Sequence, residues 1–349
     1  MSEINFDPVT LTQSLVKCAS VTPKDEGALT VVENHLSAIG CDCHPLIFSG
    51  NNSYEVKNLF ATIGNEGKHF AYAGHTDVVP VGNESSWKYP PFSAKIDEGK
   101  LYGRGSEDMK SSVACFISAA KRFVDKYENI PGKISFIITG DEERDSVNGT
   151  PRILEWASKQ NYKFDHCLVG EPTSKNEVGD KVKIGRRGSV SFFFQVKGIQ
   201  GHTANSHLAE NSSHHLVNLL NSILEEPLDE GNENFLPTSV QIATIDIGNP
   251  VQNVIPELAK ATVNIRFNDM HSSDSLIKWI DNKIEKIFSK LENASCTYTY
   301  DATAESFLNK AGDLYNIISK SISDVTGRNS PPEQATDGGT SDARYIKNY

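Results

Sequence analysis

This 349-residue sequence lacks the patterns that are typical of secreted, membrane-inserted and nucleic-acid-binding proteins. Its start has no basic segment followed by an apolar stretch, and no apolar run approaches the length that crosses a bilayer. Acidic residues outnumber basic ones by 45 to 34, which gives a net charge of −11. An acidic chain is poorly suited to anionic partners, so we expect neither a nucleic-acid nor a membrane partner.

Cysteine pairs of the C-x-x-C kind are also absent. A chain of this length can bury a large core and needs no disulfides to be stable. We therefore expect reduced thiols in a cytoplasmic protein. The six cysteines are Cys18, Cys41, Cys43, Cys115, Cys167 and Cys296.

The first part of the chain alternates helix-like and strand-like patterns. Leu29, Val32, Leu36 and Ile39 recur at helical spacing, and Gly40 follows as a stop signal. Strands that alternate with helices indicate an α/β fold, with a mostly parallel sheet flanked by helices. Apolar periodicity predicts a second helix at 113–124, and short apolar runs predict buried strands at 59–63, 70–73, 134–138 and 167–169.

The middle of the chain has a different order of elements. The patterns predict a strand, a helix, two strands and a second helix, an order typical of a ferredoxin-like α+β sheet with helices on one face. We expect an inserted domain at 186–297, between two parts of a first domain at 1–185 and 298–349. The strands are predicted at 189–199, 239–247 and 261–267, and the helices at 216–223 and 276–288, with one more helix at 314–322 in the first domain.

Acids and a histidine follow the predicted strands of the first domain. His75 and Asp77 follow one strand, Glu142 and Glu143 the next, and Glu171 the last. Ligands of open α/β sheets bind at the carboxyl ends of the strands, where converging carboxylates would repel one another without a cation. Each fragment alone also fits an ordinary solvated turn, and only their shared position favours a metal site. Imidazole and carboxylate suit zinc, with manganese or cobalt as alternatives.

Longer motifs resemble those of a known family. Residues 74–80 (GHTDVVP), 101–105 (LYGRG) and 108–110 (DMK) look like the metallopeptidase family that contains desuccinylases, acetylornithine deacetylases and carboxypeptidases. The finer resemblance is to the bacterial succinyl-diaminopimelate desuccinylases of this M20 family, and it extends along the whole chain. It rests on residues 185–189 (GRRGS), 198–202 (GIQGH), 253–256 (NVIP) and 338–342 (GGTSD).

The resemblance implies a role for each acid. His75 and Glu171 would bind a first zinc, Glu143 a second, and Asp108 would bridge the two ions, with cobalt as an alternative metal. Asp77 would orient the imidazole of His75, a role that its spacing in the sequence also favours. A cis peptide would join Asp108 to Met109. Glu142 would be the general base that takes a proton from water.

The resemblance also implies a substrate and a homodimer. His202, in the inserted domain, would act in the partner's site of the dimer. The implied substrate is N-succinyl-L,L-diaminopimelate, an intermediate of lysine biosynthesis that carries several carboxylates. Guanidinium groups match carboxylates, although arginines are also common as plain surface charge. The implied substrate-binding residues are Arg186, Arg187, Ser189, Asn253, Arg266, Gly339 and Thr340.

The sequence departs from the family pattern at several positions. Arg144 and Asp145 stand where small or apolar residues usually follow the glutamate pair, and Phe192 replaces a usual glycine. The last histidine is His271, so the family's C-terminal histidine ligand for the second zinc has no counterpart, and we expect a truncated C-terminal end. Two alternatives therefore stand beside a desuccinylase: a non-catalytic, dimerising remnant of the family, and a deacylase like acetylornithine deacetylase.

Overall fold

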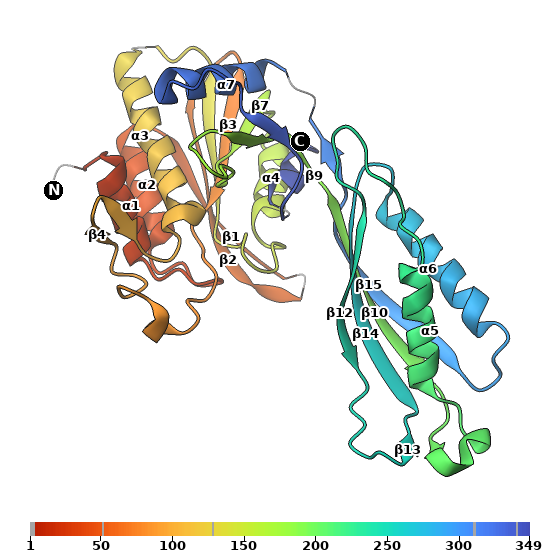
Figure 1. The fold of residues 1–349 in the computed structure, drawn as a ribbon. Coiled ribbons are helices and arrows are strands. Elements are labelled where there is room, and N and C mark those ends of the chain that lie inside the picture. The colour runs from red at the N-terminus through yellow and green to blue at the C-terminus, as the bar shows by residue number, and fades with distance from the viewer. Residues whose placement is uncertain (1–3, 51, 128, 310–311, 340) are drawn as a thin grey trace. The chain divides into compact units, whose positions relative to one another are not determined.

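The computed structural model describes residues 4–50, 52–127, 129–309, 312–339 and 341–349. The chain forms two compact units (Figure 1). Unit 1 comprises Met1–Thr173 and Ser341–Tyr349, and unit 2 comprises Ser174–Thr340. None of the helices in the described ranges is long and apolar enough to cross a membrane.

Unit 1 is built on a five-stranded sheet with the order β1-β2-β6-β3-β7. The α/β class is confirmed, but the sheet is mixed rather than mostly parallel: β3 pairs in parallel with β6 and β7, whereas β2 pairs antiparallel with β1 and β6. Its strands are β1 (Asp42–Gly50), β2 (Ser53–Gly64), β3 (His69–His75), β6 (Lys133–Thr139) and β7 (His166–Val169), and a small hairpin joins β4 (Lys95–Asp97) to β5 (Lys100–Tyr102).

Helices cover both faces of this sheet because its strands bury side chains on both (Figure 1). Leu59, Tyr72 and Phe136 face one cluster, which contains the apolar residues of three helices, while Phe60 and Ile137 face the other. The three helices are α1 (Pro8–Lys17), α2 (Ala28–Ala38) and α3 (Ser111–Lys126). The opposite face is covered by α4 (Thr150–Lys159). Unit 1 also contains the short helix α8 (Ala343–Ile346).

Unit 2 contains the predicted α+β arrangement, a four-stranded antiparallel sheet with the order β12-β14-β10-β15. Alternate residues of β10 and β14 pack against α5 and α6, which lie on one face (Figure 1). The main elements are β10 (Gly188–Lys197), α5 (Ser212–Leu224), β12 (Ser239–Asp246), β14 (Leu258–Phe267), α6 (Ser273–Phe288) and β15 (Ser295–Ala304).

The boundaries of the units differ from the expected 185/186 and 297/298. The strand β15 continues to Ala304 within the four-stranded sheet, and two short pairs, β9 with β16 and β8 with β17, add later residues to unit 2. The helix expected at 314–322 is present as α7, but in unit 2. The remaining elements are β8 (Lys181–Lys183), β9 (Gly185–Arg186), β11 (Gly201–His202), β13 (Val254–Ile255), β16 (Phe307–Leu308), α7 (Asp313–Thr326) and β17 (Glu333–Ala335).

Phe192, one of the departures from the family pattern, lies in the core of unit 2. It is fully buried, and its ring lies 6.1 Å from that of Phe194 and 5.7 Å from that of Tyr298. Phe192→Leu should lower the free energy of unfolding by about 1–2 kcal/mol, because the smaller side chain leaves a cavity. Chemical denaturation measures this. Phe193→Leu, on the exposed face of the same strand, is the control and should change stability by less than about 0.5 kcal/mol.

Candidate active site

The acids expected to converge do lie at one edge of the unit 1 sheet. His75 ends β3 and pairs with Thr139, which ends β6, so the segment 141–143 begins beside His75. Glu171 follows β7 at the same edge. Asp108 lies in the turn that leads into α3, and its peptide bond to Met109 is cis, which confirms that prediction.

Asp77 contacts both the imidazole of His75 and the backbone amides of the two glutamates. Its side chain is buried, and Oδ2 accepts a hydrogen bond from Oγ1 of Thr22 at 2.7 Å. The backbone amides of Glu142 and Glu143 donate to its two oxygens at 3.2 Å each. Nδ1 of His75 lies 3.0 Å from the backbone oxygen of Asp77 and 3.5 Å from Oδ1. Asp77 therefore orients the imidazole, mainly through its backbone oxygen, and holds both amides through its carboxylate.

The other nitrogen of His75 faces carboxylates. Nε2 lies 3.1 Å from Oδ1 of Asp108 and 3.8 Å from Oε1 of Glu171. Ligand atoms of His75, Asp108 and Glu143 all lie within 4.8 Å of one another, and so do those of His75, Glu142 and Glu171. The donor set of one imidazole and several carboxylates therefore fits a divalent cation.

Burial shapes the proton affinities of these groups. Burial, followed by the negative charge of Asp342, raises the pKa of Glu142 to about 8. Burial also raises the pKa of Glu143. In His75 burial acts in the opposite direction, but hydrogen bonds to Asp108 and Asp77 outweigh it and hold its pKa well above the ordinary value. The site thus concentrates negative charge around one imidazole, a charge that a bound cation would compensate.

Comparison with known proteins places this arrangement in a family. Residues 71–349 match the family model described as peptidase family M20/M25/M40. The chain belongs to this family. It is 44% identical over 344 residues to the succinyl-diaminopimelate desuccinylase of Parvibaculum lavamentivorans, an alignment that covers 99% of this chain and 86% of the relative.

Solved structures share the fold of this M20 chain. The aminopeptidase PepT of Bacillus cereus superposes with a TM-score of 0.75 at 18% identity, covering 99% of this chain and 88% of that one. An M20 family metallo-carboxypeptidase from Sulfolobus solfataricus also gives a TM-score of 0.75, at 16% identity, with 97% and 88% covered. At these identities the likeness supports the fold alone.

Asp342 also belongs to this site, although its place in the sequence indicates no role for it. It is buried, and Oδ2 accepts a hydrogen bond from Oγ1 of Thr150, the first residue of α4, at 2.5 Å. Burial raises the pKa of Asp342 to about 6, and its charge acts on Glu142. Its presence in the GGTSD motif could have drawn attention to Asp342 as a site residue. Nothing in the sequence indicates, however, that it lies near Glu142, 200 positions earlier.

The residues expected to bind substrate or act across the dimer lie in unit 2, and several of them form pairs. Nη1 of Arg186 donates to the backbone oxygen of Gly339 at 2.7 Å, and Ser189 pairs with Arg266 across β10 and β14. Nη1 of Arg187 instead donates to the backbone oxygen of Pro237 at 3.3 Å.

His202 and Asn253 form a further pair in unit 2. Nε2 of His202 lies 3.5 Å from Nδ2 of Asn253, and Nδ1 accepts a hydrogen bond from the amide of Ala204 at 3.0 Å. Thr340, also expected to bind substrate, lies outside the described residues. The roles of all these unit 2 residues stay predictions.

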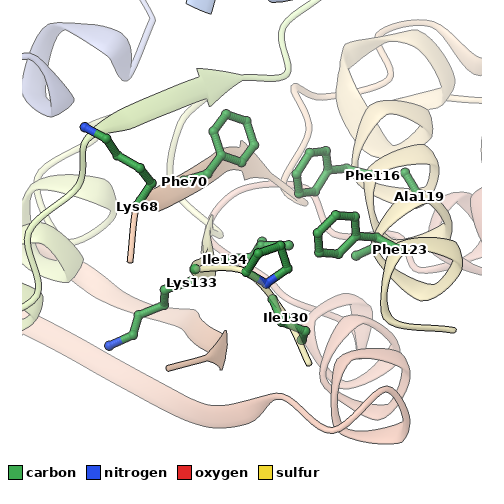
Figure 2. Close-up of a pocket in the computed structure, with 11 residues that line it drawn as sticks. Lys68, Phe70, Phe116, Ala119, Phe123, Ile130, Lys133 and Ile134 are labelled. Carbon is green, nitrogen blue, oxygen red and sulfur yellow. The ribbon is translucent and has the colours of Figure 1, made fainter. Parts of the chain in front are cut away.

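A cavity lies at the opposite end of the unit 1 strands from His75, and Figure 2 shows residues that line it. Its volume is about 390 Å³, and Phe70, Phe116 and Phe123 form much of its wall. Two lysines also line it, but Nζ of Lys68 pairs with Asp165 and Nζ of Lys133 lies over the ring of Tyr162. Among the described residues that line this cavity, no pair of groups is suited to acid–base chemistry, whereas the His75 edge brings several such groups together.

Proposed function

We propose that this M20 protein is a metal-dependent amidohydrolase that removes succinate from N-succinyl-L,L-diaminopimelate, a reaction of lysine biosynthesis. The observation that carries the proposal is the buried imidazole of His75, oriented by Asp77 and facing two carboxylates. The 44% identity to a desuccinylase over nearly the whole chain supports the choice of substrate.

Side chains of unit 1 would hold one ion tightly and a second more weakly, because the second ion has no histidine ligand. His75, Asp108 and Glu171 would hold the first, and Glu143 would hold the second, with Asp108 shared. Zinc is the expected metal, and cobalt is an alternative for the same ligands. When bound, such ions supply positive charge that polarises an amide carbonyl and acidifies water.

Glu142 would carry the proton of the reaction. It would take a proton from the attacking water and pass it to the nitrogen that leaves with diaminopimelate, which requires a pKa near neutrality. Burial raises its pKa to about 8, and positive charge held by its neighbours would lower this value toward neutrality. Its amide hydrogen bond to Asp77 fixes the backbone from which it works.

Residues of unit 2 would recognise the rest of the substrate. The guanidinium groups of Arg186, Arg187 and Arg266 are suited to the substrate's carboxylates because their planar donors can bind two oxygens at once. Ser189, Asn253 and Gly339 would add hydrogen bonds. The backbone oxygen of Gly339 is already held by Arg186, which supports a common site for these two residues.

We further propose that the protein is a homodimer in which His202 acts in the partner's site. Glu142→Gln and His202→Ala would then each be inactive for a different reason. Random mixing of the two variants gives one functional site in each mixed dimer, so activity should recover to about one quarter of the parent level. The rate of succinate release by refolded mixtures would be compared with the rate of each variant alone. No recovery from a mixture shown to exchange subunits would exclude this role for His202.

The choice of substrate is tested by competition between acyl donors. The ratio of kcat/KM for N-succinyl-L,L-diaminopimelate to that for N-acetylornithine should exceed about a hundredfold, because guanidinium donors left without a carboxylate partner in the bound state penalise the smaller acyl group. Coupled detection of succinate and acetate measures both rates. A preference for N-acetylornithine would assign the chain to the deacylase alternative.

A further inference from the structure

The end of the hairpin formed by β1 and β2 is hydrogen-bonded to the loop that carries the two glutamates. The hydroxyl of Tyr54 donates to Oδ1 of Asp141 at 2.5 Å and accepts from the amide of Asp145 at 3.1 Å. Oγ of Ser53 donates to Oδ2 of Asp145 at 2.7 Å. Two consecutive residues of β2 therefore hold the loop 141–148 at two points.

The same hairpin also holds the far end of this loop. Nδ2 of Asn148 donates to the backbone oxygens of Tyr54 at 2.8 Å and Gly50 at 3.2 Å. Oδ2 of Asp141 accepts from the amide of Asn148 at 3.3 Å, which closes the loop on itself. Asp141 and Asn148 are both fully buried, so these bonds are shielded from competing water.

Two of the residues that depart from the family pattern, Arg144 and Asp145, also contact the hairpin. Arg144 places its guanidinium 6.0 Å from the ring centre of Tyr54, and Asp145 binds both Ser53 and Tyr54. A small or apolar residue at 145 could not accept the hydrogen bond from Ser53. The hairpin thus uses the two side chains that the family pattern does not anticipate.

We propose that Tyr54 is a positioning residue for Glu142 and Glu143. Asp77 holds the amides of both glutamates from one side, and Tyr54, acting through Asp141, holds the preceding residue from the other. Fixing the loop on both sides restricts where the Glu142 carboxylate can lie, and small displacements of a catalytic group reduce rate steeply. This inference rests on the proposed function, because it assigns Tyr54 a part in the same reaction.

Tyr54→Phe tests the proposal, since it removes only the hydroxyl. We expect kcat to fall by about tenfold or more with KM changed by less than about twofold, because the loop positions the base rather than the substrate. Tyr89→Phe is the matched control: its hydroxyl also donates to an aspartate, Oδ2 of Asp97, at 2.8 Å, and Asp97 is not among the candidate site residues. The control should leave kcat and KM at the parent values.

A double mutant separates positioning through Asp141 from a general loss of packing. If Tyr54 acts through Asp141, then Asp141→Ala and the double variant Asp141→Ala/Tyr54→Phe should show the same kcat, because without the carboxylate the Tyr54 hydroxyl has no acceptor at residue 141 left to lose. Independent, multiplying losses would overturn the proposal, and so would a Tyr54→Phe kcat within about twofold of the parent.

Hydrogen exchange gives a readout that does not depend on activity. The amides of 142–148 should exchange about tenfold faster in Tyr54→Phe than in the parent or in Tyr89→Phe, because the loop has lost an anchor. Unchanged exchange would overturn the inference even if the parent hydrolyses its substrate. If exchange is faster in Tyr54→Phe but the parent hydrolyses nothing, the proposed function is overturned while the anchoring of the loop by Tyr54 stands.

Discussion

Glu142→Gln should reduce succinate release by about 10²–10⁴-fold and leave the amount of bound metal unchanged. An amide side chain keeps the size of the glutamate but cannot accept a proton from water. The hydrogen bond from residue 142 to Asp77 is made by the backbone amide, so the loop should keep its position. Steady-state assays and metal analysis on the same preparation measure both quantities.

Glu143→Gln distinguishes the base from a metal ligand. Glu143 is the neighbouring acid, also held by Asp77 through its backbone amide, and its proposed role is to bind the second ion. Its substitution should lower metal content as well as activity. The assignment of Glu142 as the base fails if Glu142→Gln keeps activity within tenfold of the parent, or if it loses metal as Glu143→Gln does.

Asp77→Ala should lower metal affinity by about 10–100-fold and activity by at least as much. The substitution removes a buried carboxylate that accepts from Thr22 and from two backbone amides while facing the imidazole of His75. The amides of the two glutamates would then lose their shared acceptor, and the imidazole of His75 would keep only its contact with the backbone oxygen of residue 77. Titration with zinc, followed by kinetics at saturating metal, separates the loss of affinity from the loss of rate.

Thr22→Val is the matched control for this substitution. It removes one hydrogen bond to Asp77, 2.7 Å long, and leaves the contacts with His75, Glu142 and Glu143 in place. Its metal affinity and kcat should stay within about tenfold of the parent, because a single neutral donor contributes on the order of 1 kcal/mol. If Thr22→Val and Asp77→Ala are equally impaired, the effect is a general disturbance of packing rather than orientation of the site.

The edge of the sheet at which the candidate site lies could be predicted, because apolar strands and acidic residues alternate along the chain. The apolar run at 70–73 predicts β3, and His75 closes that strand in the structure. The same holds for β6 and for Glu142 and Glu143, which follow it. Once these strands are neighbours, their carboxyl ends must bring the acids together.

The direction of strands and the ends of units were harder to predict. The edge strand β1 contains Pro45 and alternates exposed with partly buried residues, so it has no apolar run that would indicate a strand. Periodicity carries no information on whether β2 runs parallel or antiparallel to β6. The strand β15 is mostly exposed and polar, so its sequence does not indicate that it belongs to the sheet of unit 2.

Long-range polar contacts also could not be predicted from the sequence. Tyr54 and Asp141 are 87 positions apart, and neither residue type indicates the other. The positions of Arg144 and Asp145 could be recognised as unusual, but only the structure shows that the β1–β2 hairpin contacts them. Such pairs depend on register and turn geometry, which a hydrophobic pattern does not specify.

The most direct test of the central claim is succinate release from N-succinyl-L,L-diaminopimelate by the purified protein, measured with zinc, after chelation, and after zinc or cobalt is restored. The account predicts hydrolysis that stops on chelation and returns with metal, since the proposed ligands Asp108 and Glu171 both face the imidazole of His75. A metal-loaded protein that releases no succinate, or one that releases it at the same rate without metal, would contradict the account.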